Sequence, residues 1–153
     1  MNYEVVTKMV NSQVLAAVRR RVPIGEVSRA WGPPLDLVWE FLRRHDGLRT
    51  DGHNCFLYHH PPNRETPMEV DFGVQVSRPF EGEGEVKCTQ TPAGEVVMTT
   101  HIGSYAKLAA AHDAIHLWRL ASGRAFGGYS WEIYGDWTDN GTKLETQVVY
   151  LLS

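Results

Sequence analysis

Short stretches in which apolar and polar residues alternate occur along the whole chain, and this alternation is typical of β-strands. The clearest stretches lie at about 12–21, 55–60, 68–77, 94–101, 130–136 and 144–151. Further strands are expected near 4–9 and 85–91. Turn-forming residues, Pro61-Pro62-Asn63 and Asp139-Asn140-Gly141, separate the members of two strand pairs. The sequence therefore predicts mainly antiparallel strands.

Two stretches instead repeat their apolar residues every three or four positions, which is helical spacing. One such stripe consists of Leu108, Ala111, Ile115 and Trp118, and Gly123 follows where a helix commonly ends.

The other stripe begins at Val27, but Gly32-Pro33-Pro34 interrupts it because proline disrupts a helix interior. We expect this helix to restart at Pro34 or Leu35, to run to about Arg44 and to be ended by Gly47.

An internal duplication organises these elements. Gly52 and Gly128 are 76 positions apart (128 − 52), and so are Tyr58 and Tyr134 (134 − 58). Each half reads strand, helix, strand, strand, which predicts a first module over about 1–79 and a second over about 84–153. The fold class is therefore α+β, with a helix covering one face of each antiparallel sheet.

Successive strand residues point to opposite faces, so Trp131 and Ile133 share one face while Glu132 and Tyr134 share the other. A helix-covered face disfavours an unpaired carboxylate. We therefore expect Trp131 to face the helix and Glu132 to point away from it. In the first half, Cys55 and Leu57 are the counterparts expected toward the helix.

The faces predicted to be uncovered carry Phe56, Tyr58, Tyr134 and the single acid Glu132, a composition typical of a small-molecule pocket. A carboxylate among aromatic rings suits a lipophilic cation. The same surroundings are expected to raise the pKa of Glu132, which would also suit a general acid or base. The alternative is that Glu132 lies on a solvated sheet face.

Composition narrows the classes of function. The 15 Lys and Arg against 18 Asp and Glu give a net charge of −3, whereas nucleic-acid binders usually carry a basic excess. No apolar run reaches the roughly 20 residues of a membrane span, and no secretory signal is recognised. We therefore expect a cytoplasmic protein that contacts neither nucleic acid nor membrane. Cys55 and Cys88 are expected to be buried or partly buried thiols.

Other polar residues are weaker candidates. His112 and His116 have a spacing that can hold zinc, but no third ligand follows, and a solvated helix face is favoured. His53, His59 and His60 are read as structural. Arg19 and its counterpart His101 are candidates for contact with a ligand. No metal or cofactor is expected.

Several short motifs of the second half form a recognisable set. They are Pro92-x-Gly94, His101-x-Gly103-x-Tyr105, Trp131-Glu132-x-Tyr134 and Thr146-x-Val148. Together with the first half, they make the chain resemble the GyrI-like small-molecule-binding domain, the effector-binding domain of bacterial transcription activators. The resemblance implies two SHS2-like modules related by a pseudo-twofold axis, with a ligand cleft between them and Glu132 at its floor.

The chain departs from this family pattern at two places. Gly32-Pro33-Pro34 interrupts a helix that is usually continuous, so the cleft rim near Trp31 is expected to differ. Ser104 stands where many members have proline, and serine is a good helix N-cap. No helix-turn-helix segment is recognised beside the two modules, which suggests a stand-alone form.

Three functions follow from this reading. The first is binding of lipophilic aromatic compounds, cations among them, with Trp31, Tyr105 and Trp137 as further wall residues. The second, implied by the family, is hydrolysis of reactive cyclopropane-bearing compounds by Glu132 and Tyr134. The third is inhibition of DNA gyrase. The expected partner is a small molecule, and no protein partner can be named from the sequence.

Overall fold

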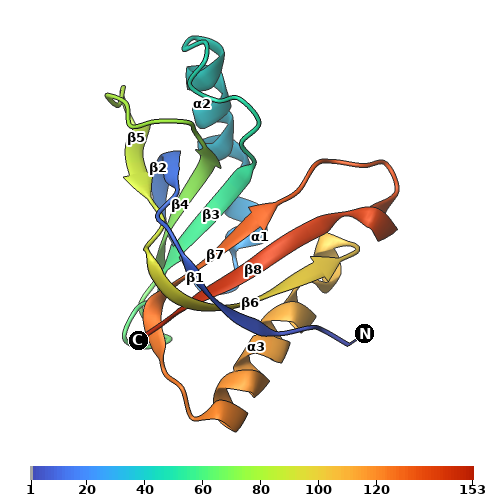
Figure 1. The fold of residues 1–153 in the computed structure, drawn as a ribbon. Coiled ribbons are helices and arrows are strands. Elements are labelled where there is room, and N and C mark those ends of the chain that lie inside the picture. Colours follow the sequence, from blue (N-terminus) through green and yellow to red (C-terminus); the bar gives the residue numbers. More distant parts are fainter. Residues whose placement is uncertain (1) are drawn as a thin grey trace.

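The alternating stretches form strands, and both helical stripes form helices, in the computed structural model, which describes residues 2–153. The strands are β1 (Val6–Val10), β2 (Val14–Val22), β3 (Asn54–His59), β4 (Met68–Gln75), β5 (Lys87–Gln90), β6 (Gly94–Ile102), β7 (Phe126–Tyr134) and β8 (Glu145–Leu152). The helices are α1 (Val27–Ala30), α2 (Gly32–Arg43) and α3 (Ala109–Ser122), with short 3-10 turns η1 (Tyr105–Lys107) and η2 (Gly141–Lys143). The α+β class is confirmed (Figure 1).

Helix α2 begins at Gly32, two residues before the earlier of the two predicted starts, and ends at Arg43, next to the predicted end at about Arg44. The break between α1 and α2 falls at Trp31, directly before Gly32-Pro33-Pro34, and the prolines occupy the first turn of α2, where no helical N–H is lost. Helix α3 ends at Gly123, whose φ of 72° is the left-handed conformation that glycine adopts without strain. Ser104 caps η1, because its side chain accepts a hydrogen bond from the backbone N–H of Ala106.

All eight strands belong to one antiparallel sheet, rather than to a separate sheet in each half. The order is β1-β6-β8-β7-β3-β4-β2-β5. This order is symmetric about the contact between β7 and β3, so the halves join edge to edge. The two outermost strands cross over: β1 pairs with β6 of the second half, and β5 pairs with β2 of the first.

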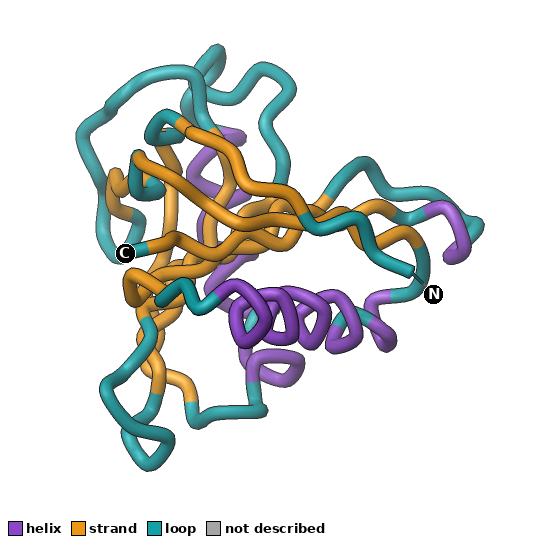
Figure 2. Tube along the Cα trace, turned by 60° about the horizontal axis from the view of Figure 1, so that its bottom comes forward, coloured by secondary structure: helices purple, strands orange, loops and turns teal. Residues whose placement is uncertain are grey.

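All three α-helices lie on one face of this sheet, here called the helix face. Helix α2 packs on β2 and β4, and α3 packs on β6 and β8. Figure 2 shows α3 running alongside the strands on one side of the sheet. Helices α1 and α2 cover one apolar cluster, around Phe41 and Phe72, and α3 covers another, around Ile115 and Val148.

The opposite face of the sheet is also buried, which corrects the predicted orientation of the central strands. Cys55, Leu57 and Trp131 do not face a helix but pack on this second face with Leu15 of β2 and Val96 of β6. Four strands separate β2 from β6 in the sheet, so the sheet curves until its ends share one cluster. Because both faces are covered, the apolar side chains of β7 did not identify the helix face.

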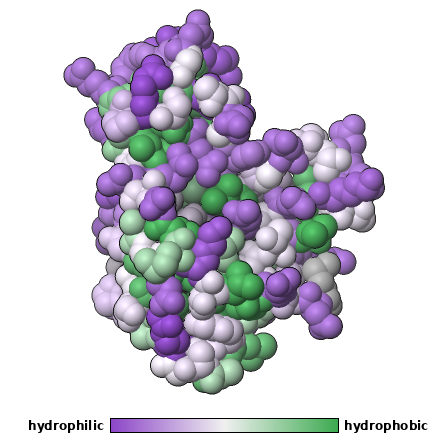
Figure 3. Space-filling view, in the orientation of Figure 1, coloured by the Kyte–Doolittle hydropathy of each residue, from purple (hydrophilic) through white to green (hydrophobic). Residues whose placement is uncertain are grey.

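The surface of the molecule is mixed. On the side drawn in Figure 3, hydrophilic residues cover the upper end, and hydrophobic residues reach the surface at the centre and below. Cys55 and Cys88 are both free thiols; Cys55 is buried as expected, whereas Cys88 is exposed. Among residues 2–153, no helix has the length and apolarity that a membrane crossing would need.

Candidate functional site

Glu132 lies at the centre of the sheet, on the helix face. Its strand, β7, pairs with β3 on one side and β8 on the other, so that Phe56 and Val148 are its direct neighbours. Those neighbours belong to the clusters beneath α2 and α3, respectively. Glu132 therefore sits between the two helix-covered clusters, and only 5% of it is exposed.

Three side chains hydrogen-bond the buried carboxylate. The hydroxyls of Tyr58 and Tyr134 both donate to Oε1, the latter over 2.6 Å. Nε2 of His112, on α3, lies 2.7 Å from Oε2. Both oxygens are thus engaged by residues from three separate elements, β3, β7 and α3. The sequence correctly placed Glu132, Tyr58, Tyr134 and Phe56 on one face, although this is the helix face and not an uncovered one.

The balance of forces on Glu132 favours its ionised form. Burial by itself raises the pKa of a carboxyl group, but the hydrogen bonds and charge of His112 and the hydroxyls of Tyr134 and Tyr58 outweigh it. The pKa of Glu132 is consequently lowered, not raised as the aromatic surroundings suggested. The predicted raised pKa was wrong because it took account of burial but not of three donors.

The two tyrosines remain protonated donors. Burial, with the negative charge of Glu132 nearby, raises the pKa of both Tyr58 and Tyr134 well above the usual value. The carboxylate therefore keeps two O–H donors over any ordinary pH.

A second polar layer continues outward from His112. Its Nδ1 lies 2.7 Å from the hydroxyl of Tyr150 on β8, and that hydroxyl is 3.4 Å from Nε2 of His116. His60 bonds the Ser130 hydroxyl over 2.6 Å and stacks on the ring of Tyr150. Burial lowers the pKa of His60 and of His116, with the other histidines contributing. Three imidazoles thus surround one tyrosine beside the acid.

The expectation of a solvated face for His112 is therefore wrong, and His112 is the site residue that sequence reasoning missed. The available signal was its position directly after Ala111, which places it at the border of the apolar stripe of α3. The apolar stripe of α3 faces β6 and β8. A residue at the border of the stripe, such as His112, therefore faces the next strand, β7.

The aromatic residues predicted for the pocket walls separate into two groups. Around the acid, the ring of Tyr134 meets Phe56 and Tyr105 edge-on, with centroids 4.9 and 5.5 Å apart. Tyr105 is 38% exposed and so connects this buried pair to the surface. Trp31 and Trp137 are 45% and 71% exposed; Trp31 sits at the start of α2 and Trp137 in the loop after β7.

His101 lies on the helix face but already has its own partners. Its ring nitrogens contact the Tyr3 hydroxyl at 2.8 Å and the Ser104 carbonyl at 2.9 Å, and the residue is fully buried. It therefore supports the chain before η1.

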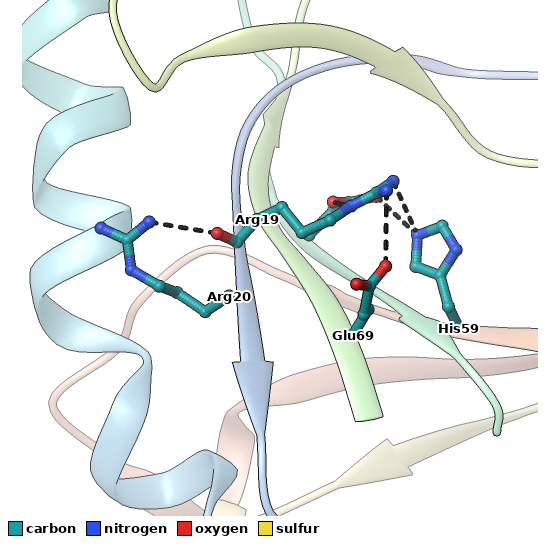
Figure 4. A network of polar contacts seen from close by, with 5 residues as sticks. Arg19, Arg20, His59 and Glu69 are labelled. Carbon is teal, nitrogen blue, oxygen red and sulfur yellow. Dashed lines mark hydrogen bonds and ion pairs between the residues drawn. The ribbon is translucent and has the colours of Figure 1, made fainter. Parts of the chain in front are cut away.

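Arg19 lies on the opposite face of the sheet from Glu132 and His101, so these two candidate ligand contacts do not face the same site. Figure 4 shows the Arg19 side chain directed toward His59 and Glu69. Its Nε donates to the buried carboxylate of Asp71 over 2.8 Å, and His59 Nε2 contacts the same carboxylate at 2.7 Å. A groove of about 490 Å³ runs beside Arg19 and Asp71, and the sheet separates it from Glu132.

Several solved structures share this fold. The C-terminal domain of EcmrR aligns with a TM-score of 0.81 at 22% identity over 100% of this chain and 99% of that one. The chain spans 57% of the EcmrR chain in its complex with DNA. SAV2435 bound to tetraphenylphosphonium aligns with a TM-score of 0.70 at 10% identity over 100% of this chain and 94% of that one. A hydrolase from Listeria innocua aligns at 0.62 and 12% identity, over 98% and 92%.

These identities establish the fold alone, and the family comes from the sequence. The family model of the GyrI-like small molecule binding domain matches residues 1–150. The chain therefore belongs to the GyrI-like family. Comparison with curated proteins gives no match.

Proposed function

We propose that this GyrI-like domain binds lipophilic aromatic compounds, with a preference for organic cations, at the helix face around Glu132. The observation that carries the proposal is a single ionised carboxylate, 5% exposed, set between aromatic side chains at the centre of the sheet. Burying a charged carboxylate costs free energy, and a cation that binds beside it neutralises the charge and offsets that cost.

The surrounding rings supply the second component of affinity. Phe56 and Tyr134 pack edge-on beside the carboxylate, and Tyr105 extends the ring system toward the surface. A cation held over such ring faces gains roughly 0.5–2 kcal/mol per ring. Aromatic groups on the ligand would bury further apolar area against the same residues.

The carboxylate of Glu132 is covered by its own hydrogen-bond donors, so a ligand reaches it by displacing one of them. Tyr58 is almost fully buried, whereas the His112 side chain is 24% exposed. Entry from the side of His112 and Tyr105 therefore disturbs the buried core least.

The proposal is tested by titrating the protein with tetraphenylphosphonium and measuring affinity by calorimetry or fluorescence. Glu132→Gln keeps the shape and removes the charge, and it should weaken binding by at least tenfold. The matched control is Asp71→Asn, which neutralises the other buried carboxylate on the opposite sheet face. It should leave affinity unchanged, provided that circular dichroism shows a folded protein. Equal affinity of wild type and Glu132→Gln would refute the anchor role.

One feature favours a second candidate, hydrolysis of small electrophiles. An ionised Glu132 hydrogen-bonded to Tyr134 places a base beside a hydroxyl that can donate to a developing anion. The hydrolase from Listeria innocua that shares the fold is consistent with this second candidate. Turnover of a reactive cyclopropane compound by wild type, but not by Glu132→Ala, would establish it; binding without turnover would leave the receptor role alone.

A further inference from the structure

We propose that His112 is the resident counter-ion of Glu132, and that an organic cation binds by replacing the proton that His112 carries. This inference rests on the proposed function and specifies how the site selects charge. When His112 carries that proton, the pair is an imidazolium and a carboxylate. Binding then exchanges one positive charge for another: the cation enters, one proton leaves to solvent, and the site keeps the same net charge.

The geometry around the ring suits a doubly protonated imidazole. Nε2 lies 2.7 Å from Oε2 of Glu132, an acceptor with no proton of its own. Nδ1 lies 2.7 Å from the hydroxyl oxygen of Tyr150, which accepts as readily as it donates. Both N–H groups of an imidazolium are therefore satisfied, and one of them faces the carboxylate of Glu132 directly.

His112 is the group that supplies a positive charge opposite the carboxylate of Glu132, because the other groups that face His112 are neutral or acidic. They are Glu132 on β7, Tyr150 on β8, His60 after β3, and His116 and Asp113 on its own helix, with Tyr58 and Tyr134 beyond the carboxylate. Burial keeps the pKa of His60 and His116 low, so both stay neutral near neutral pH. The tyrosines are neutral as well.

A route out exists for the proton. Tyr150 lies between His112 and His116 and contacts the facing nitrogen of each, at 2.7 and 3.4 Å. A proton passed from Nδ1 of His112 through this hydroxyl reaches His116, which is exposed to solvent. The proton can therefore leave from Nδ1 of His112 while the ligand lies beside Oε2 of Glu132.

Proton exchange of this kind makes affinity depend on pH in a defined direction. At low pH the proton competes with the cation, and at high pH His112 is neutral and no competition remains. Because one proton is exchanged per ligand, the affinity should rise with pH by up to about tenfold per unit until His112 is neutral. A neutral ligand meets no such competition.

The experiment is isothermal titration of the protein with tetraphenylphosphonium, a permanent cation that cannot itself titrate. Measurement at about pH 6 and about pH 8, in two buffers of different ionisation enthalpy, gives the number of protons released. Wild type should release protons on binding, and it should release more at the lower pH than at the higher. His112→Gln should release none and should bind with an affinity that does not change with pH.

His116→Gln is the matched control, because it removes an imidazole from the same helix and the same tyrosine without touching Glu132. It should release as many protons as wild type, because a calorimetric proton count is an equilibrium quantity and does not depend on the route by which the proton leaves. Triphenylphosphine oxide, a neutral compound with the same rings, should bind without releasing protons.

The outcomes separate the two proposals. If the cation binds wild type with no proton release, or His112→Gln releases as many protons as wild type, the counter-ion role is wrong and the binding function stands. If the cation binds at neither pH, both are wrong. Should His112→Gln fail to fold, the proton count of wild type and of His116→Gln still decides.

Discussion

Tyr58 and Tyr134 stand 76 positions apart in the chain (134 − 58) and donate hydrogen bonds to the same atom, Oε1 of Glu132. The register explains this convergence. Phe56 and Glu132 are also 76 positions apart (132 − 56), and they lie directly opposite each other across β3 and β7. The local twofold relation therefore passes through this pair, with one tyrosine on each side. The acid breaks the symmetry, because its counterpart is phenylalanine.

The first prediction concerns these two donors. Tyr58→Phe and Tyr134→Phe each remove one hydroxyl from a buried charge, and hydrogen bonds to charged groups contribute about 1.5–3 kcal/mol. Each variant should lower the free energy of unfolding by an amount in that range, as measured by urea denaturation. In a double-mutant cycle with Glu132→Gln, the cost of removing either hydroxyl should shrink. Purely additive losses would show that the hydroxyls do not act through the carboxylate.

Much of this arrangement could be predicted from local sequence. Strand alternation has a strict period of two, so Glu132 and Tyr134 had to share a face. The internal duplication then assigned Phe56 and Tyr58, the counterparts of Glu132 and Tyr134, to the same face. Gly123 identified the end of α3, because glycine adopts the left-handed conformation without strain, and Gly32-Pro33-Pro34 identified the region of the α2 start, because proline restricts the backbone.

The errors arose from tertiary structure. Trp131 was assigned to the helix side because an apolar side chain needs cover, but the curvature of the sheet provides cover on its other face as well. His112 was assigned to a solvated helix face because the sequence does not show which residue a histidine will contact in the fold. Its role depends on α3 crossing the sheet so that one edge of the helix overlooks β7. Neither the curvature nor the crossing follows from a pattern along one segment.

The second prediction concerns Asp71 and acid stability. Burial raises the pKa of its carboxyl, but hydrogen bonds from His59 and Arg19 more than compensate, and the pKa is lowered overall. A carboxyl whose pKa is lower in the folded than in the unfolded state stabilises the fold above the unfolded pKa, about 3.9 for aspartate, and that contribution disappears as pH falls through the folded pKa.

Asp71→Asn should therefore lower the free energy of unfolding by about 1.5–3 kcal/mol at neutral pH. The difference from wild type should narrow as the pH falls below about 4. Chemical denaturation across that range measures it. A difference that stays constant with pH would mean that the loss comes from packing alone.

The third prediction concerns His60. Burial, with the nearby His112 and His116, lowers the pKa of its imidazole in the fold. Between that folded pKa and the unfolded value of about 6.5, the unfolded chain binds a proton that the folded chain does not. Stability is therefore lost as the pH falls through this window.

His60→Gln removes this titration while keeping a group that can bond the Ser130 hydroxyl. Its free energy of unfolding should depend less steeply on pH below the unfolded value of about 6.5 than that of wild type. Thermal or urea unfolding at several pH values measures the slopes. Parallel profiles for variant and wild type would contradict the assignment of His60 as a buried neutral imidazole.

The fourth prediction concerns the aromatic rim and follows from the proposed function. Tyr105 is 38% exposed, and its ring packs edge-on against Tyr134, so it should form part of the surface that an aromatic cation covers. Tyr105→Ala should weaken tetraphenylphosphonium binding by roughly 0.5–2 kcal/mol, whereas Tyr105→Phe, which keeps the ring, should bind nearly as wild type. The control is Tyr129→Ala. Tyr129 is 37% exposed but packs beside His59, which places it on the face of the sheet that carries Asp71. If Tyr105→Ala and Tyr129→Ala weaken binding equally, the ligand does not bind selectively at the helix face, and the proposed site around Glu132 is wrong.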